Sequence, residues 1–153
     1  MTTSLGDKIT NVLTGTISSV NKVFPFSKSI SEPIPFKEPF MQDSIGVLIG
    51  LIGDIKGRIL IAGNETSFSG LGESMFGMPI QGVMLESFAG ELGNMVVGNL
   101  CTEIWATGVQ IDITPPTVFV GQTKIFGFEK AYKLPIMFEN IGNLNIIIML
   151  ENE

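Results

Sequence analysis

Histidine is absent from this 153-residue chain, and cysteine, tryptophan and tyrosine each occur once. Without histidine, the sequence excludes Ser-His-Asp and Cys-His catalysis, acid–base catalysis by histidine, and nearly all zinc sites. It also lacks the lysine-containing phosphate loop and the glycine-rich dinucleotide fingerprint that follows a strand. The single cysteine, Cys101, cannot form an internal disulfide, and we expect it to pack inside a helix.

Charged residues are also scarce. They make up 16% of the chain, the formal net charge is −6, and the mean hydropathy is +0.40. A nucleic acid or an anionic membrane surface attracts clusters of lysine and arginine, and the sequence contains none, so we expect neither partner. With 44% hydrophobic residues and so few charges, part of the apolar surface is expected to be covered in an oligomer.

No long hydrophobic run is present either. The longest apolar run, residues 45–53, contains three glycines and is too short to span a bilayer. Residues 1–6 lack the basic and apolar regions of a signal peptide. Together with the lack of a possible disulfide, this predicts a cytoplasmic protein. The length predicts one domain over residues 1–153.

The spacing of the apolar residues predicts an α+β fold. Helices are expected over residues 7–24, from a cap at Asn64 to Phe76, and over residues 81–107. Strands are expected over residues 42–51, 56–62, 109–114, 118–120, 132–139 and 143–150. These elements form a mainly antiparallel sheet of about six strands with three helices packed on it.

Three segments leave alternatives open. Residues 25–39 hold four of the eight prolines and predict an extended connector or an edge strand, because proline cannot donate to a central ladder. The sequence of residues 124–129 is ambiguous and predicts no particular secondary structure. The last strand is continuously apolar, which predicts cover on both faces of the sheet or burial between subunits.

The helix over residues 81–107 carries the polar residues best suited to chemistry. At about 100° per residue, one narrow stripe holds Ser87, Glu91, Asn94 and Gly98. The opposite side holds Leu85, Ala89, Leu92, Val96 and Leu100. This helix is therefore amphipathic, with its apolar side toward a core and one carboxylate beside one carboxamide on the outside.

Three glycines accompany that stripe. Gly90, Gly93 and Gly98 each cost roughly 1 kcal/mol in a helix interior relative to alanine, so another backbone or another protein is expected to come close. A plainer interpretation is also open. A glutamate and an asparagine on a helix surface are usually only solvated, and helix glycines are usually packing sites.

The helical series Ser87, Glu91 and Asn94 resembles the signature of the CheC/CheX/FliY family of bacterial chemotaxis phosphatases. That signature begins with Asp or Ser, continues with Glu and Asn at these offsets, and has a proline a little over twenty residues later. The run GNMVVGNLCTEIW, followed by a strand and Pro115-Pro116, is similar to the CheX branch, as is the chain length. The family spacing places the proline at Thr117, so the proline pair is shifted by one residue, with an effect on activity that the sequence does not define.

The resemblance implies a substrate and a set of roles. The family substrate is the phosphorylated response regulator CheY, which carries an aspartyl phosphate and supplies its own Mg²⁺ and lysine. No metal or cofactor is therefore expected on this chain. Asn94 would position the attacking water and Glu91 would pair with the regulator's lysine, with a general-base role for Glu91 as the less attractive alternative. Ser87, Gly90 and Gly98 would form the surface that the regulator approaches.

The resemblance also bears on the number of sites and subunits. CheC-type relatives carry a second motif, but the first helix here offers Asp7, Asn11 and Thr14 at the signature offsets, so one centre is expected. The resemblance to the CheX branch implies a homodimer. The apolar last strand would suit a contact between subunits at the edge or the face of the sheet. Trp105 falls on the stripe as well, either as an interface anchor or as a packing residue at the helix end.

Two functions in different classes follow. The first is a phosphatase that removes the aspartyl phosphate of a CheY-type regulator. The alternative is a non-catalytic module of the same fold that binds a receiver domain or a component of the flagellar switch. The intact pair of Glu91 and Asn94 favours the phosphatase.

Overall fold

The computed structural model describes residues 5–37, 39–42, 44–128 and 130–151. The expectation that residues 1–6 form no signal peptide falls mostly on residues 1–4, which lie outside the described residues. The helices are α1 (Leu5–Val23), α2 (Glu65–Phe76) and α3 (Val83–Trp105). The strands are β1 (Lys28–Ile30), β2 (Ile34–Phe36), β3 (Phe40–Gln42), β4 (Ile45–Gly53), β5 (Gly57–Gly63), β6 (Ile111–Ile113), β7 (Thr117–Val120), β8 (Thr123–Ile125), β9 (Lys130–Phe138) and β10 (Gly142–Leu150). Within the described ranges, no helix combines the length and the apolar character needed to cross a membrane.

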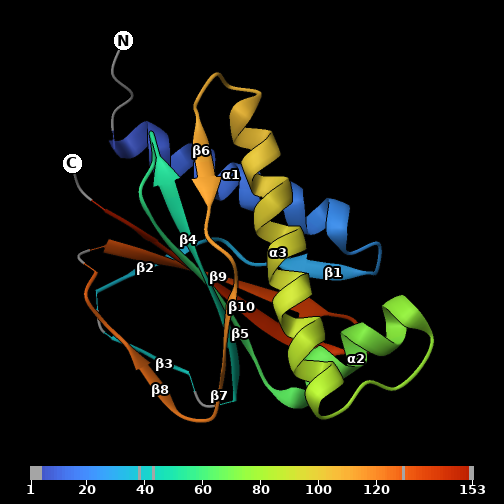
Figure 1. The fold of residues 1–153 in the computed structure, drawn as a ribbon. Coiled ribbons are helices and arrows are strands. Elements are labelled where there is room, and N and C mark those ends of the chain that lie inside the picture. The colour runs from blue at the N-terminus through green and yellow to red at the C-terminus, as the bar shows by residue number, and fades with distance from the viewer. Residues whose placement is uncertain (1–4, 38, 43, 129, 152–153) are drawn as a thin grey trace.

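An antiparallel sheet forms the centre of the molecule (Figure 1). It has eight strands, so the expectation of about six was too low, although the α+β class is confirmed. The order across the sheet is β1-β9-β10-β5-β4-β6, with β2 also pairing with β9 and β7 also pairing with β4. The sheet is thus six positions wide, because two short strands share each outer position. The two short strands of the proline-rich segment, β1 and β2, lie at an edge, where Pro35 of β2 breaks no central ladder.

The last strand, β10, lies in the interior of the sheet between β9 and β5. Its alternate residues Ile146 and Ile148 join the core under the helices, whereas Ile147 and Met149 join a smaller cluster on the other face. The continuous apolar run is therefore explained by cover on both faces within the chain. A dimer built on a free edge of this strand is ruled out, and the expected homodimer remains a prediction.

A two-stranded ribbon, β3 with β8, covers part of the face opposite the helices. The cluster beneath it includes Ile125 of β8 and the partly buried Phe40 of β3. Residues 124–129, which the sequence left undecided, thus begin within this ribbon. Residue 129 itself lies outside the described residues.

The helices cover the other face of the sheet (Figure 1). Helix α1 packs closely against α3, since a Cβ added at Gly15 would lie 2.7 Å from Leu100 Cδ1. Helix α2 begins where predicted, because the Asn64 side chain accepts a hydrogen bond from the Ser67 amide at 2.7 Å. It ends at Gly77, whose left-handed φ of 74° suits glycine. The chain then turns directly into α3, which carries the predicted site.

Candidate functional site

The outer stripe of α3 is the candidate site. Ser87, Glu91 and Asn94 are exposed, as their spacing predicts. The opposite positions are all buried: Leu85, Ala89, Leu92, Val96 and Leu100. One face of the helix is therefore held by the core, which fixes the direction in which the polar side chains project.

The side chains of Glu91 and Asn94 are not used for polar contacts within the described part of the fold. Among the described residues, neither side chain makes a hydrogen bond, an ion pair or a ring contact. They lie three positions apart on a helix, so they are neighbours on its surface. A rigid helix thus presents a carboxylate and a carboxamide that are both available to a partner.

Two of the three helix glycines serve the internal packing of the protein. A Cβ at Gly93 would lie 2.7 Å from Val47 Cγ1 on β4, and one at Gly90 would lie 3.2 Å from Val118 Cγ2 on β7. Gly90 is buried, so its expected place on the partner surface is wrong. The close neighbours of these two glycines are the chain's own strands, β7 and β4. A Cβ at Gly98 would have nothing within 4 Å, and Gly98 therefore stays a candidate for partner contact.

The proline pair lies between β6 and β7, two short strands that follow one another along the edge of β4. Pro116 Cγ is 4.0 Å from the position that a Cβ at Gly90 would occupy. Despite the shift of one residue from the family spacing, this proline therefore lies against α3 at Gly90, the residue before Glu91. The segment between β6 and β7 and the helix are packed together at the level of the candidate site.

A second asparagine and glutamate lie further along α3, and both are used by the fold. The half-buried Asn99 donates its amide to the Met95 carbonyl at 3.0 Å, as expected for a buried asparagine. Glu103 accepts hydrogen bonds from Lys22 and Ser18 of α1. The hydrogen bond from Lys22, and secondarily that from Ser18, lowers the pKa of Glu103 below its ordinary value. This partner on α1 accounts for a carboxylate near the apolar side of the helix.

The two remaining distinctive side chains of α3 pack at its C-terminal end. Trp105 donates its indole N–H to the Ile111 carbonyl at 2.8 Å. This contact agrees with the expectation of a packing tryptophan, although the residue is 54% exposed. Cys101 is buried, as expected, and burial raises the pKa of its thiol, with a smaller effect from Asp112. A reactive thiolate is thereby disfavoured.

A groove borders the stripe at the start of α3. We name it the α2–α3 groove, and its lining consists of Phe76, Met78, Ile80, Val83, Met84, Ser87, Phe88 and Glu91. Its volume is about 670 Å³. The sequence predicted Ser87 and Glu91 here but missed the exposed apolar residues beside them. The run Met75 to Met78, which ends α2, was the available signal.

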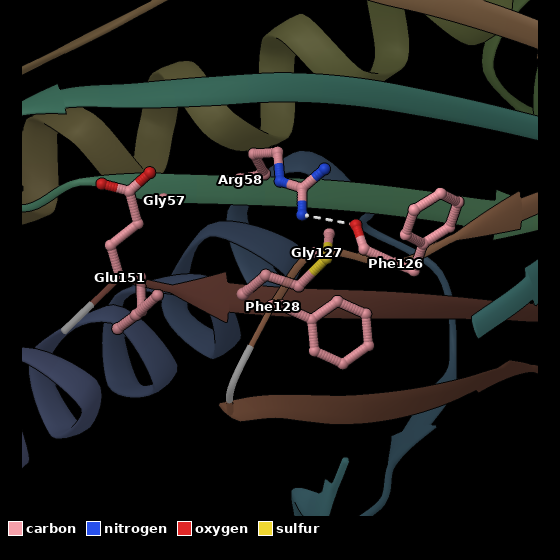
Figure 2. A pocket seen from close by; sticks show the side chains of 8 residues that line it. Gly57, Arg58, Phe126, Gly127, Phe128 and Glu151 are labelled. Carbon is pink, nitrogen blue, oxygen red and sulfur yellow. Dashed lines mark hydrogen bonds between the residues drawn. The ribbon is translucent and has the colours of Figure 1, made fainter. Parts of the chain in front are cut away.

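A second hollow lies on the sheet face opposite the helices and has a structural explanation. Figure 2 shows Arg58 of β5 donating to the Phe126 carbonyl, at 3.2 Å, beside Gly127 and Phe128. This hydrogen bond links β5 to the residues that follow β8. This hollow contains none of the predicted site residues. Across the described ranges, no three histidine, cysteine or acidic residues gather as a metal-binding group.

Comparisons with known proteins give a family for the chain. A family model described as "Chemotaxis phosphatase CheX" matches residues 45–130. The "CheY-P phosphatase CheX" of Thermotoga maritima is 31% identical over 134 residues, covering 84% of this chain and 86% of that protein.

Solved structures share the fold. A CheC-like superfamily protein from Shewanella sp. PV-4 has a TM-score of 0.80 at 20% identity, over 93% of this chain and 98% of that chain. CheX in the CheX–CheY–BeF₃–Mg²⁺ complex of Borrelia burgdorferi has a TM-score of 0.72 at 19% identity, over 94% of this chain and 97% of that chain. The α+β fold expected from the sequence is thus found in these relatives.

Proposed function

The chain belongs to the CheX family of chemotaxis phosphatases, and from this premise we propose that it hydrolyses the aspartyl phosphate of a CheY-type response regulator. The observation that carries the proposal is the exposed pair of Glu91 and Asn94 on α3, whose side chains make no hydrogen bond or ion pair with the described residues. The name of the Thermotoga maritima relative supports the same substrate.

Asn94 positions the attacking water. The carboxamide oxygen accepts a hydrogen bond from the water, and the NH₂ group donates to a phosphoryl oxygen. Water forms a new bond to phosphorus as the bond between phosphorus and the aspartyl oxygen breaks, which releases inorganic phosphate and leaves the aspartate carboxylate. Because an amide carries no charge, it can stand beside the phosphoryl group without electrostatic repulsion. Placement of the water in line with the leaving oxygen supplies the rate enhancement.

Glu91 pairs with the lysine of the regulator and fixes the docked orientation. Lysine and arginine are absent from residues 59–123, the part of the sequence that contains α2 and α3. The same residues include Glu65, Glu73, Glu86, Glu91, Glu103 and Asp112. The local charge therefore favours a basic contact from the partner. A general-base role for Glu91 is less suitable, because its carboxylate would have to stand beside a phosphoryl anion.

The regulator supplies the metal in this scheme. Mg²⁺ neutralises charge on the phosphoryl oxygens from the regulator's side, while this chain contributes the amide and the carboxylate. The family also suggests a homodimer in the cytoplasm, with Ser87 and Gly98 beside the docked regulator. These points remain part of the proposal.

The test is the release of inorganic phosphate from the phosphorylated cognate regulator, with the native chain, with Asn94→Ala and without either. The proposal predicts that the native chain accelerates release and that the variant does not. A native chain that binds the phosphorylated regulator but leaves its rate of phosphate loss unchanged would identify a binding module and contradict the proposal.

A further inference from the structure

Exposed apolar residues gather where α2 ends and α3 begins. The exposed fractions are 58% for Phe76, 55% for Met78, 78% for Val83 and 61% for Met84. Such clustering on an otherwise polar helix surface is typical of an interaction site. All four residues line the α2–α3 groove.

This groove is continuous with the candidate catalytic stripe. Ser87 and Glu91 form one end of its lining. Met84, Ser87, Glu91 and Asn94 follow one another at offsets of three, four and three, so they share one side of α3. At a rise of about 1.5 Å per residue, Met84 lies about 15 Å along the helix from Asn94.

We propose that the α2–α3 groove is the docking surface for the receiver domain and takes an apolar side chain that lies near the receiver's lysine. The proposal rests on the proposed function, because it assigns a further contact to the same partner. Met84 and Met78 would be anchors of this contact. They supply flexible apolar surface and touch none of the reacting atoms.

An interface of ordinary size, centred on Asn94, is wide enough to include the α2–α3 groove. A stable complex buries about 800 Å² on each side, which corresponds to a disc with a radius of about 16 Å. A domain centred on Asn94 therefore reaches Met84. Charge also matches, since Glu86 and Glu91 flank the apolar residues and residues 59–123 contain no basic side chain.

The groove is formed before any partner binds. Phe76 of α2 lies against Phe88 of α3 in an edge-on arrangement, with ring centroids 5.7 Å apart. Gly77 and Gly82 have positive φ values of 74° and 63°, which suit glycine, and the turns at these residues bring the end of α2 to the start of α3. A preformed apolar site loses little conformational freedom on binding, which favours affinity.

The experiment compares the double variant Met78→Gln/Met84→Gln with Met137→Gln. Met137 on β9 is 59% exposed, so the control makes the same chemical change at an equally exposed site away from α3. The kinetics of dephosphorylation are measured over a range of regulator concentrations. We expect KM to rise about tenfold in the double variant, with kcat unchanged, and neither value to change in Met137→Gln. Asn94→Ala should show the opposite signature, with kcat lost and KM retained.

Binding of the regulator loaded with beryllofluoride and Mg²⁺ provides a readout that needs no catalysis. The double variant should bind about tenfold more weakly than the native chain. If the double variant binds more weakly but the native chain has no phosphatase activity, the docking surface is supported and the proposed function fails. An unchanged KM and unchanged binding would overturn the docking surface while the function stood. Loss of self-association with unchanged regulator binding would also overturn it, by assigning the groove to a contact between two copies of the chain.

Discussion

Helix α3 carries two pairs of asparagine and glutamate, and the two pairs differ in burial and in hydrogen bonding. Asn99 and Glu103 are partly buried, and each is hydrogen-bonded, one to the Met95 carbonyl and the other to residues of α1. Glu91 and Asn94 are exposed, and their side chains have no partner among the described residues. The same residue types on one helix therefore have structural and functional assignments that depend on which way they face.

The difference gives a way to separate stability from activity within one element. Changes to Asn99 or Glu103 remove contacts that the fold uses, so they should alter the free energy of unfolding. Changes to Glu91 or Asn94 remove no hydrogen bond or ion pair within the described residues, so they should alter catalysis or docking alone.

The largest effect is expected from Asn94→Asp. The carboxylate cannot donate a hydrogen bond and places a negative charge next to the phosphoryl group. We expect kcat for phosphate release to fall about a hundredfold, since the water is no longer held in line. The matched control, Asn99→Asp, should keep the native kcat and lose about 1 kcal/mol of stability with its hydrogen bond. Retention of native kcat by Asn94→Asp would refute the assigned role.

Gly93→Ala should produce the next largest effect, on stability. The added methyl would meet Val47 Cγ1 at 2.7 Å, so either Val47 or α3 must shift. Overpacking of this kind costs about 1–3 kcal/mol, measurable as a lower free energy of unfolding in urea.

Gly98→Ala is the comparison for that change. Its methyl would meet open space, and alanine favours a helix by up to about 1 kcal/mol, so the fold should become more stable. We expect KM for the regulator to rise nonetheless, because the methyl stands on the proposed docking stripe. If both alanine variants destabilise the fold equally, the distinction between internal and external glycines is wrong.

Glu91→Gln should raise KM about tenfold and leave thermal stability unchanged. Removing the carboxylate weakens the pairing with the regulator's lysine, and KM should then depend less on ionic strength. Glu103→Gln serves as the control and should leave KM unchanged, because its carboxylate faces α1. An equal rise of KM in both variants would mean that KM depends on the total charge of α3 and not on the carboxylate of Glu91.

The smallest effect concerns acid stability. The pKa of Glu103 is lowered from 4.5, chiefly by the hydrogen bond from Lys22. A lowered pKa in the folded state stabilises the protein fully above the unfolded pKa, and this contribution is lost as the pH falls through the lowered value. The difference in Tm between the native chain and Glu103→Gln should therefore shrink on acidification below pH 4.5. Ser18→Ala, which removes the lesser hydrogen bond, should show a smaller change. Parallel Tm curves for the native chain and Glu103→Gln would contradict this role.

Much of α3 was predictable because helical periodicity is a local property. Positions such as Leu92 and Val96 are buried and Asn94 is exposed, as their spacing requires. The cap at Asn64 was equally predictable, since an asparagine before a helix accepts a hydrogen bond from the first turn. The exposed stripe of the candidate site could therefore be identified without coordinates.

Contacts between distant segments could not be predicted in this way. The neighbours of Gly90 and Gly93 come from β7 and β4, and the partners of Glu103 come from α1. No periodic pattern within α3 encodes them. The β3–β8 ribbon was missed for a related reason, because strands of three residues are too short to show alternation. The apolar side of the site was missed because it arises only where the ends of two helices meet.

The most direct test of the account is a single-turnover measurement with the chain in excess over the phosphorylated regulator. When the concentration of the chain is also well above the dissociation constant, the regulator is fully bound, and the observed rate constant reports the hydrolysis step rather than docking. The account predicts that Asn94→Ala lowers this rate constant about a hundredfold, while Asn99→Ala, on the same helix, leaves it at the native value. Equal rate constants for Asn94→Ala and the native chain would contradict the central claim that the exposed amide positions the water.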